Sequence, residues 1–99
     1  MRSKGVECLS WIGEAEDALR RADYEVAATH LRRVTAYLWT TQELELYPKY
    51  ARKLCDCYLA AAQARRAQGD VVHAAFFYRA AATKLRELGD EAGAARCKQ

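Results

Sequence analysis

The sequence predicts an all-α protein in which antiparallel helical hairpins stack side by side. Three observations support this prediction. Along most of the chain, apolar residues recur at spacings of three and four, which is the period of an amphipathic helix. The pattern Asp-x-x-x-Ala-Ala occurs three times, beginning at Asp23, Asp70 and Asp90. Proline occurs once, and no segment shows the alternation of apolar and polar residues that is typical of a strand.

Turn signals divide the chain into four main helices and a short C-terminal helix. Aspartate favours the N-cap position, because its carboxylate accepts hydrogen bonds from the first turn of a helix. We therefore place three turns at Ala22-Asp23, Gly69-Asp70 and Gly89-Asp90. Pro48 marks the remaining break, because proline suits the start of a helix and not its interior. The helices are expected at about residues 5–21, 24–45, 48–68, 70–88 and 91–97, and residues 1–99 are expected to form one domain.

The segment from Gly69 to Leu88 is apolar on almost every side of a helix. A surface helix has a single apolar stripe, so this one is expected to be central and covered on several sides. Gly13, inside the first helix, costs about 1 kcal/mol relative to alanine, and we interpret it as a point where another helix approaches closely. The first helix has one predicted buried stripe, formed by Val6, Leu9, Ile12, Ala15, Leu19 and Ala22.

Charge is distributed unevenly along the chain, although the net charge is only +3. Residues 1–48 carry six Lys/Arg and eight Asp/Glu, which gives −2, whereas residues 49–99 carry ten and five, which gives +5. So small a net charge does not point to a nucleic-acid partner. The basic second half can bind an acidic partner, or it can pair with the acidic first half.

The cysteines and the hydropathy favour a cytoplasmic or nuclear protein. The first residues lack the apolar region of a secretory signal, and no apolar run approaches the roughly 20 residues that span a bilayer. We therefore expect no membrane insertion. The four cysteines, at positions 8, 55, 57 and 97, are expected to be reduced thiols.

Two segments resemble the tetratricopeptide repeat (TPR), a helix–turn–helix unit of about 34 residues. The first has the family's residue types at Trp11, Ala15, Asp23, Tyr24 and Ala27. The second has them at Tyr58, Ala62, Gly69, Asp70, Ala74, Tyr78 and Ala81. Asp23 and Asp70 lie 47 residues apart, so the helices are longer than is usual in the family. In this longer repeat spacing the chain is similar to long-helix variants such as the soluble NSF attachment proteins.

The resemblance implies a protein–protein interaction module: an adaptor, a scaffold or a subunit of a larger complex. Such a module would bind a helix or peptide of another protein, and its open apolar ends could support a homo-oligomer. An alternative reading is a three-helix microtubule-interacting-and-trafficking-like domain over residues 6–68, which would bind helical motifs of trafficking proteins. The family's clamp for a chaperone C-terminal carboxylate uses asparagines, and their absence here argues against that activity.

The residues around Pro48 are the candidate partner-binding site. Three aromatic residues gather there, and aromatic residues next to a loop are common binding hot spots; they are Trp39, Tyr47 and Tyr50. Their alternative role is packing between helices. Three basic residues, Lys49, Arg52 and Lys53, either contact an acidic peptide or pair with Glu14 and Asp17. In the TPR family the first helix of each hairpin lines the groove, which implies one acidic wall and one basic wall here.

A second alternative is a metal-binding or enzymatic protein built on cysteine and histidine. Cys55 and Cys57 are the only close cysteine pair, but residues two apart on a helix point in nearly opposite directions and cannot share one zinc ion. No local motif supplies a nucleophile and an orienting acid to His30 or His73. We therefore expect no enzyme activity, no metal and no cofactor.

Overall fold

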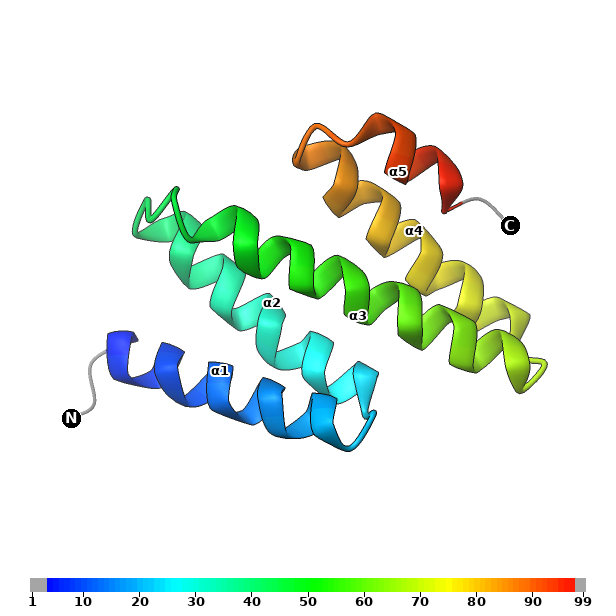
Figure 1. The fold of residues 1–99 in the computed structure, drawn as a ribbon, viewed down its shortest axis with the longest axis horizontal. Helices are drawn as coiled ribbons and strands as arrows, with labels where there is room; N and C mark the ends of the chain where they lie inside the picture. Colours follow the sequence, from blue (N-terminus) through cyan, green and yellow to red (C-terminus); the bar gives the residue numbers. More distant parts are fainter. Residues whose placement is uncertain (1–3, 98–99) are drawn as a thin grey trace. The chain divides into compact units, whose positions relative to one another are not determined.

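The fold is all-α, as the sequence predicts. A computed structural model describes residues 4–97, and this part of the chain contains no strand (Figure 1). Its helices are packed in adjacent pairs. They are α1 (Lys4–Arg20), α2 (Tyr24–Thr40), α3 (Tyr47–Ala67), α4 (Val71–Glu87) and α5 (Glu91–Arg96).

The chain divides into two compact units, Met1–Leu54 and Cys55–Gln99. The first unit comprises α1, α2 and the start of α3. The second comprises the rest of α3, α4 and α5. The division therefore falls inside a helix and not in a linker.

The core of the first unit forms where α1 and α2 run antiparallel (Figure 1). Cys8, Val34 and Leu38 are buried together. Five partly buried side chains pack against them: Trp11, Ile12, Tyr37, Tyr47 and Tyr50. The predicted stripe of α1 is wrong at both ends, because Val6 and Leu9 are 49% and 69% exposed and Ala22 lies exposed in the turn after the helix. The buried face is rotated towards smaller residues, which are Cys8, Ala15 and Ala18.

Gly13 does not mark a close approach within the described chain. A Cβ atom added to it would meet no neighbouring atom within 4 Å. The sequence interpretation of Gly13 as a contact point is therefore wrong for these helices. The space beside its Cα is open.

In the second unit, α4 packs on α3 along one face only. The rings of Tyr58 and Phe77 stack with their centroids 6.2 Å apart. Because α5 also contacts α4, the prediction that α4 is covered on several sides fails only for its N-terminal part, where Val71 and Val72 are 61% and 76% exposed and Phe76 is exposed too. The helix with the broadest buried arc is α3, through Ala51, Leu54, Cys55, Cys57, Tyr58, Ala61 and Ala62.

Four helices end in the same way, with a residue in the left-handed region just after the helix. The N–H group of the next residue then donates to the carbonyl five residues earlier, as Asp23 does to Ala18 at 2.8 Å and Asp70 to Arg65 at 2.9 Å. The left-handed residues are Ala22 and Gln42, both at φ 56°, Gly69 at φ 80° and Gly89 at φ 82°. The predicted end of the second helix near residue 45 is therefore wrong, since α2 ends at Thr40.

The three copies of the Asp-x-x-x-Ala-Ala pattern form the same local structure at the start of a helix. The first alanine of each pair is buried and donates its N–H to the carbonyl of the aspartate; these alanines are Ala27, Ala74 and Ala94. The side chain of Asp70 accepts from the N–H of His73, and that of Asp90 accepts from the N–H of Gly93. The N-cap prediction is confirmed for these two residues. Asp23 also occupies the N-cap position of α2, but its side chain forms no capping hydrogen bond, so that part of the prediction is wrong.

The turn at Ala22 gives a first test. An L-residue in the left-handed region costs about 1–2 kcal/mol, and glycine avoids this cost while losing roughly 0.5–1 kcal/mol through its freedom in the unfolded chain. We expect Ala22→Gly to stabilise the fold by about 0.5–1 kcal/mol in urea unfolding. Ala36→Gly is the matched control, because Ala36 is exposed inside α2 and should lose about 1 kcal/mol. Equal losses in both variants would contradict the turn geometry.

The two caps give a second test. The N–H of His73 holds the pKa of the Asp70 carboxyl below its ordinary value of 3.8, and the His73 side chain and Arg65 act in the same direction. A carboxyl with a lowered folded pKa stabilises the fold above its unfolded pKa, and this stabilisation is lost as the pH falls through the folded value. At neutral pH, Asp70→Ala should therefore be less stable than Asp23→Ala. The stability difference between wild type and Asp70→Ala should shrink as the pH falls below 3.8 and through the lowered folded pKa, and a constant difference would rule out this account.

Candidate functional site

The turn between α2 and α3 gathers exposed apolar side chains in the first unit. We call this surface the α2–α3 corner, and it consists of Trp39, Leu44, Leu46, Tyr47 and Tyr50. Trp39 is 62% exposed, and its ring lies 5.3 Å from that of Tyr47 at an interplanar angle of 55°. Leu44 and Leu46 are exposed as well. Tyr47 and Tyr50 are partly buried against the core of the unit, so these two tyrosines take part in packing between helices, which is one of the two roles that the sequence left open.

Two lysines flank the corner. The Nζ atoms of Lys49 and Lys53 lie 5.5 and 5.6 Å from the centroid of the Tyr50 ring. At such distances an ammonium group is attracted to the face of the ring. Arg52 is exposed on the same helix. The structure thus brings the predicted aromatic residues and two of the predicted basic residues together.

The two predicted acidic residues lie elsewhere. Glu14 Oε2 is 3.2 Å from Nδ1 of His30, but this contact is not a hydrogen bond, and Nδ1 is buried with no hydrogen-bond partner among the described residues. Asp17 forms an ion pair with Arg20 on α1. Asp17 lies beside the turn that precedes α2, whereas the corner lies at the other end of that helix. A helix of 17 residues is about 25 Å long, so the structure does not bring Glu14 and Asp17 to the corner.

A shallow groove lies near the corner, between α1 and the C-terminal part of α2. It has a volume of about 530 Å³ and is lined by Trp11, Arg33, Ala36, Tyr37, Thr40 and Thr41. The hydroxyl groups of Thr40 and Thr41 donate to backbone carbonyls at 2.9 Å, so these side chains present mainly their methyl groups. Sequence analysis did not identify this groove. The only signal for it is the threonine pair, which at first sight suggests a weak point in the helix.

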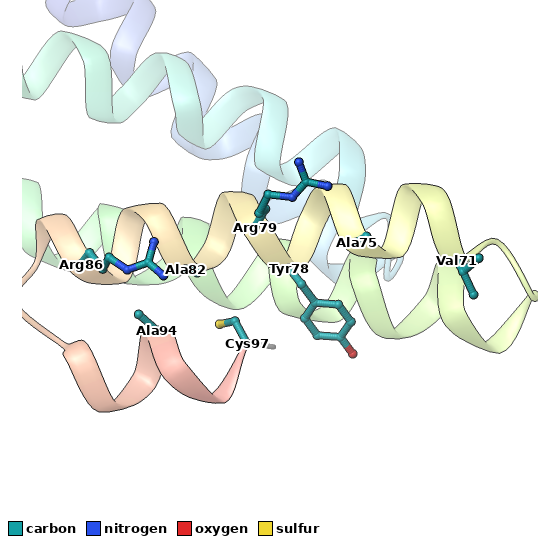
Figure 2. Close-up of a pocket in the computed structure, with 8 residues that line it drawn as sticks. All are labelled: Val71, Ala75, Tyr78, Arg79, Ala82, Arg86, Ala94 and Cys97. Carbon is teal, nitrogen blue, oxygen red and sulfur yellow. The ribbon is translucent and has the colours of Figure 1, made fainter. Parts of the chain in front are cut away.

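A second groove lies between α4 and α5 in the second unit, and Figure 2 shows its lining. Its volume is about 700 Å³. Because α5 has six residues and α4 has 17, α5 faces only the C-terminal part of α4, and Val71 lies beyond its end (Figure 2). We call this surface the α4–α5 groove; it is lined by Val71, Ala75, Tyr78, Arg79, Ala82, Arg86, Ala94 and Cys97.

One side of the α4–α5 groove is basic. Arg79 and Arg86 are seven residues apart, so they lie two turns apart on the same side of α4. Neither forms an ion pair with the residues that the structure describes, unlike Lys84, whose Nζ is 2.9 Å from Glu87. The groove therefore combines an apolar floor with two available guanidinium groups. Sequence analysis missed it because it took α4 to be covered on several sides.

The four thiols are buried, and none of them forms a disulfide bond. Burial raises the pKa of the Cys8 thiol, with Glu43 acting in the same direction. Burial also raises the pKa of Cys97, by more than Arg96 and Arg86 lower it. Thiols of this kind are weak nucleophiles at neutral pH. Between residues 4 and 97, no three metal-binding side chains lie close enough together to hold an ion.

The comparisons with known proteins add no family. No protein-family model, curated protein or solved structure matches this chain. The resemblance to tetratricopeptide repeats therefore stays a prediction. As for membranes, no helix within the described residues combines the length and the apolar character needed to cross a bilayer.

Proposed function

We propose that this protein is a protein–protein interaction module, and that the α2–α3 corner binds a helix or an extended peptide of another protein. The observation that carries the proposal is the exposure of Trp39, at the end of α2, together with Leu44 and Leu46 in the turn that follows. Large apolar side chains that gather on a surface and are flanked by charge commonly mark a binding site. Binding would remove these side chains from water.

The corner is preorganised, because its aromatic side chains pack within the first unit in the absence of a partner. Tyr47 and Tyr50 are fixed against the core of the first unit, and Trp39 lies against the ring of Tyr47. A rigid aromatic surface loses little conformational entropy on binding. The corner is therefore suited to act as an anchor for one or two apolar residues of a partner.

The charge beside the corner favours an acidic residue in the partner. Lys49 and Lys53 approach the ring of Tyr50 from the exposed side of α3. Exposed charges of this kind affect the rate of association and the choice of partner more than the final affinity. The proposed ligand is therefore a segment with apolar anchors and a nearby carboxylate, and the proposal includes no catalytic step.

A peptide selection tests this proposal without a known partner. A phage-displayed random peptide library selected on the wild-type chain should yield peptides with apolar residues and at least one Asp or Glu. These peptides should lose binding to Trp39→Ala, with a dissociation rate raised by about 10- to 100-fold, where each tenfold corresponds to about 1.4 kcal/mol. Lys49→Glu combined with Lys53→Glu should instead slow association and weaken its dependence on salt.

Val26→Ala is the matched control, because Val26 is also exposed on α2 but lies far from the corner. It should leave binding unchanged. Circular dichroism should show the same helical content in all variants. Peptides that bind wild type and Trp39→Ala equally well would remove the corner from consideration as the binding surface.

A further inference from the structure

The outer face of α1 is a second exposed apolar surface, separate from the corner. Leu9, Gly13 and Glu16 follow one another at spacings of four and three, so they lie in one row along the helix. Val6 lies beside this row and is exposed, and Leu9 is the more exposed of the two. Glu16 is exposed and has no ion-pair partner among the residues that the structure describes.

Gly13 lies in the middle of this row. Glycine inside a helix is destabilising, because it loses more freedom on folding than other residues. Its usual benefit is to let another backbone approach, yet nothing in the described chain occupies the space beside it. A helix of another molecule would fill that space.

The α4–α5 groove has the complementary properties. Its floor is formed by apolar and small side chains, including Val71, Ala75 and Ala82. Its rim carries Arg79 and Arg86, whereas the row on α1 carries a carboxylate. The same contrast runs through the whole chain, because residues 1–48 have a net charge of −2 and residues 49–99 have +5.

We infer that α1 of one copy of this chain docks in the α4–α5 groove of a second copy. Leu9 and Gly13 would contact the floor of the groove beside α4, and Glu16 would meet one of the two rim arginines. This contact uses none of the corner residues, so it goes beyond the proposed function and can fail independently of it. This contact would explain both why apolar residues are exposed on α1 and why part of α4 is left uncovered.

Such a contact has a defined symmetry. The two surfaces that meet are different, so the interface is heterologous, and each copy in a pair keeps one free α1 face and one free groove. Heterologous contacts add further copies until a ring closes or a filament forms. A twofold dimer, in which the same surface meets itself, would not behave in this way.

Sedimentation velocity on the 99-residue chain tests the inference. The weight-average mass should rise above the 11.2 kDa of one copy as the concentration increases, and species larger than a dimer should appear. Leu9→Asp and Val71→Asp should each weaken association at least tenfold. A mixture of the two variants should form dimers and nothing larger, because each variant retains the surface that the other has lost.

Val72→Asp is the matched control for Val71→Asp. The two valines are adjacent and similarly exposed, but only Val71 lines the groove. Val72→Asp should associate like the wild type. Three results would each overturn the inference: a wild type that stays monomeric up to about 1 mM, equal effects of the two valine variants, or a mixture of Leu9→Asp and Val71→Asp that remains monomeric.

Gly13→Ala separates association from folding. Because the space beside Gly13 is open within one copy, the added methyl group should raise the midpoint of thermal unfolding of dilute, monomeric protein by about 4–8 °C. The same methyl group should keep α1 further from the groove and weaken association several-fold. A variant that is more stable and associates as strongly as the wild type would show that no helix approaches at this position.

Discussion

The structure depends on one backbone feature, a residue in the left-handed region that ends a helix and directs the chain into the next one. Its hydrogen bond from the following N–H group satisfies a carbonyl that the helix would otherwise leave open. At three of the four such ends the next helix starts with an aspartate at its N-cap and a small residue four positions later. Ala27, Ala74 and Ala94 are buried at that position, and larger side chains there would push neighbouring helices apart.

Much of this could be predicted from the sequence, because turns and helix periods are local properties. The Asp-x-x-x-Ala-Ala pattern placed three of the turns, and all five helix starts fall within one residue of their predicted positions. The end of α2 could not be predicted, since Gln42 is not a residue type that signals a left-handed turn. The buried face of α1 was also misjudged, because hydropathy favours Val6 and Leu9, while close packing between helices selects Cys8 and Ala18.

For the candidate sites, too, the sequence predicted features that are local and missed those that depend on packing between helices. The aromatic residues near Pro48 could be predicted as a group because they are close in sequence, and the structure brings Trp39 onto Tyr47. The pairing of Glu14 with His30 was not predictable, since it depends on the register between two helices. The α4–α5 groove was missed for a different reason. The short length of α5 was predicted, but the apolar character of α4 was interpreted as burial on several sides, so the part of α4 beyond α5 was not expected to be open.

The exposed valines and leucines have an energetic consequence. Burying one such side chain fully is worth about 1.5–3 kcal/mol, and short helical arrays leave apolar surface at the places where a neighbouring repeat would stack. The exposed residues here form three groups. Trp39, Leu44 and Leu46 belong to the α2–α3 corner, and Val6 and Leu9 lie on one face of α1. Val71 lies at the open end of the α4–α5 groove. Single exposed apolar residues need no explanation, but three separate groups on a chain of 99 residues do. Each group has a charged residue beside it, and that arrangement favours a specific partner over non-specific aggregation, because the charge must be matched when the apolar surface is buried.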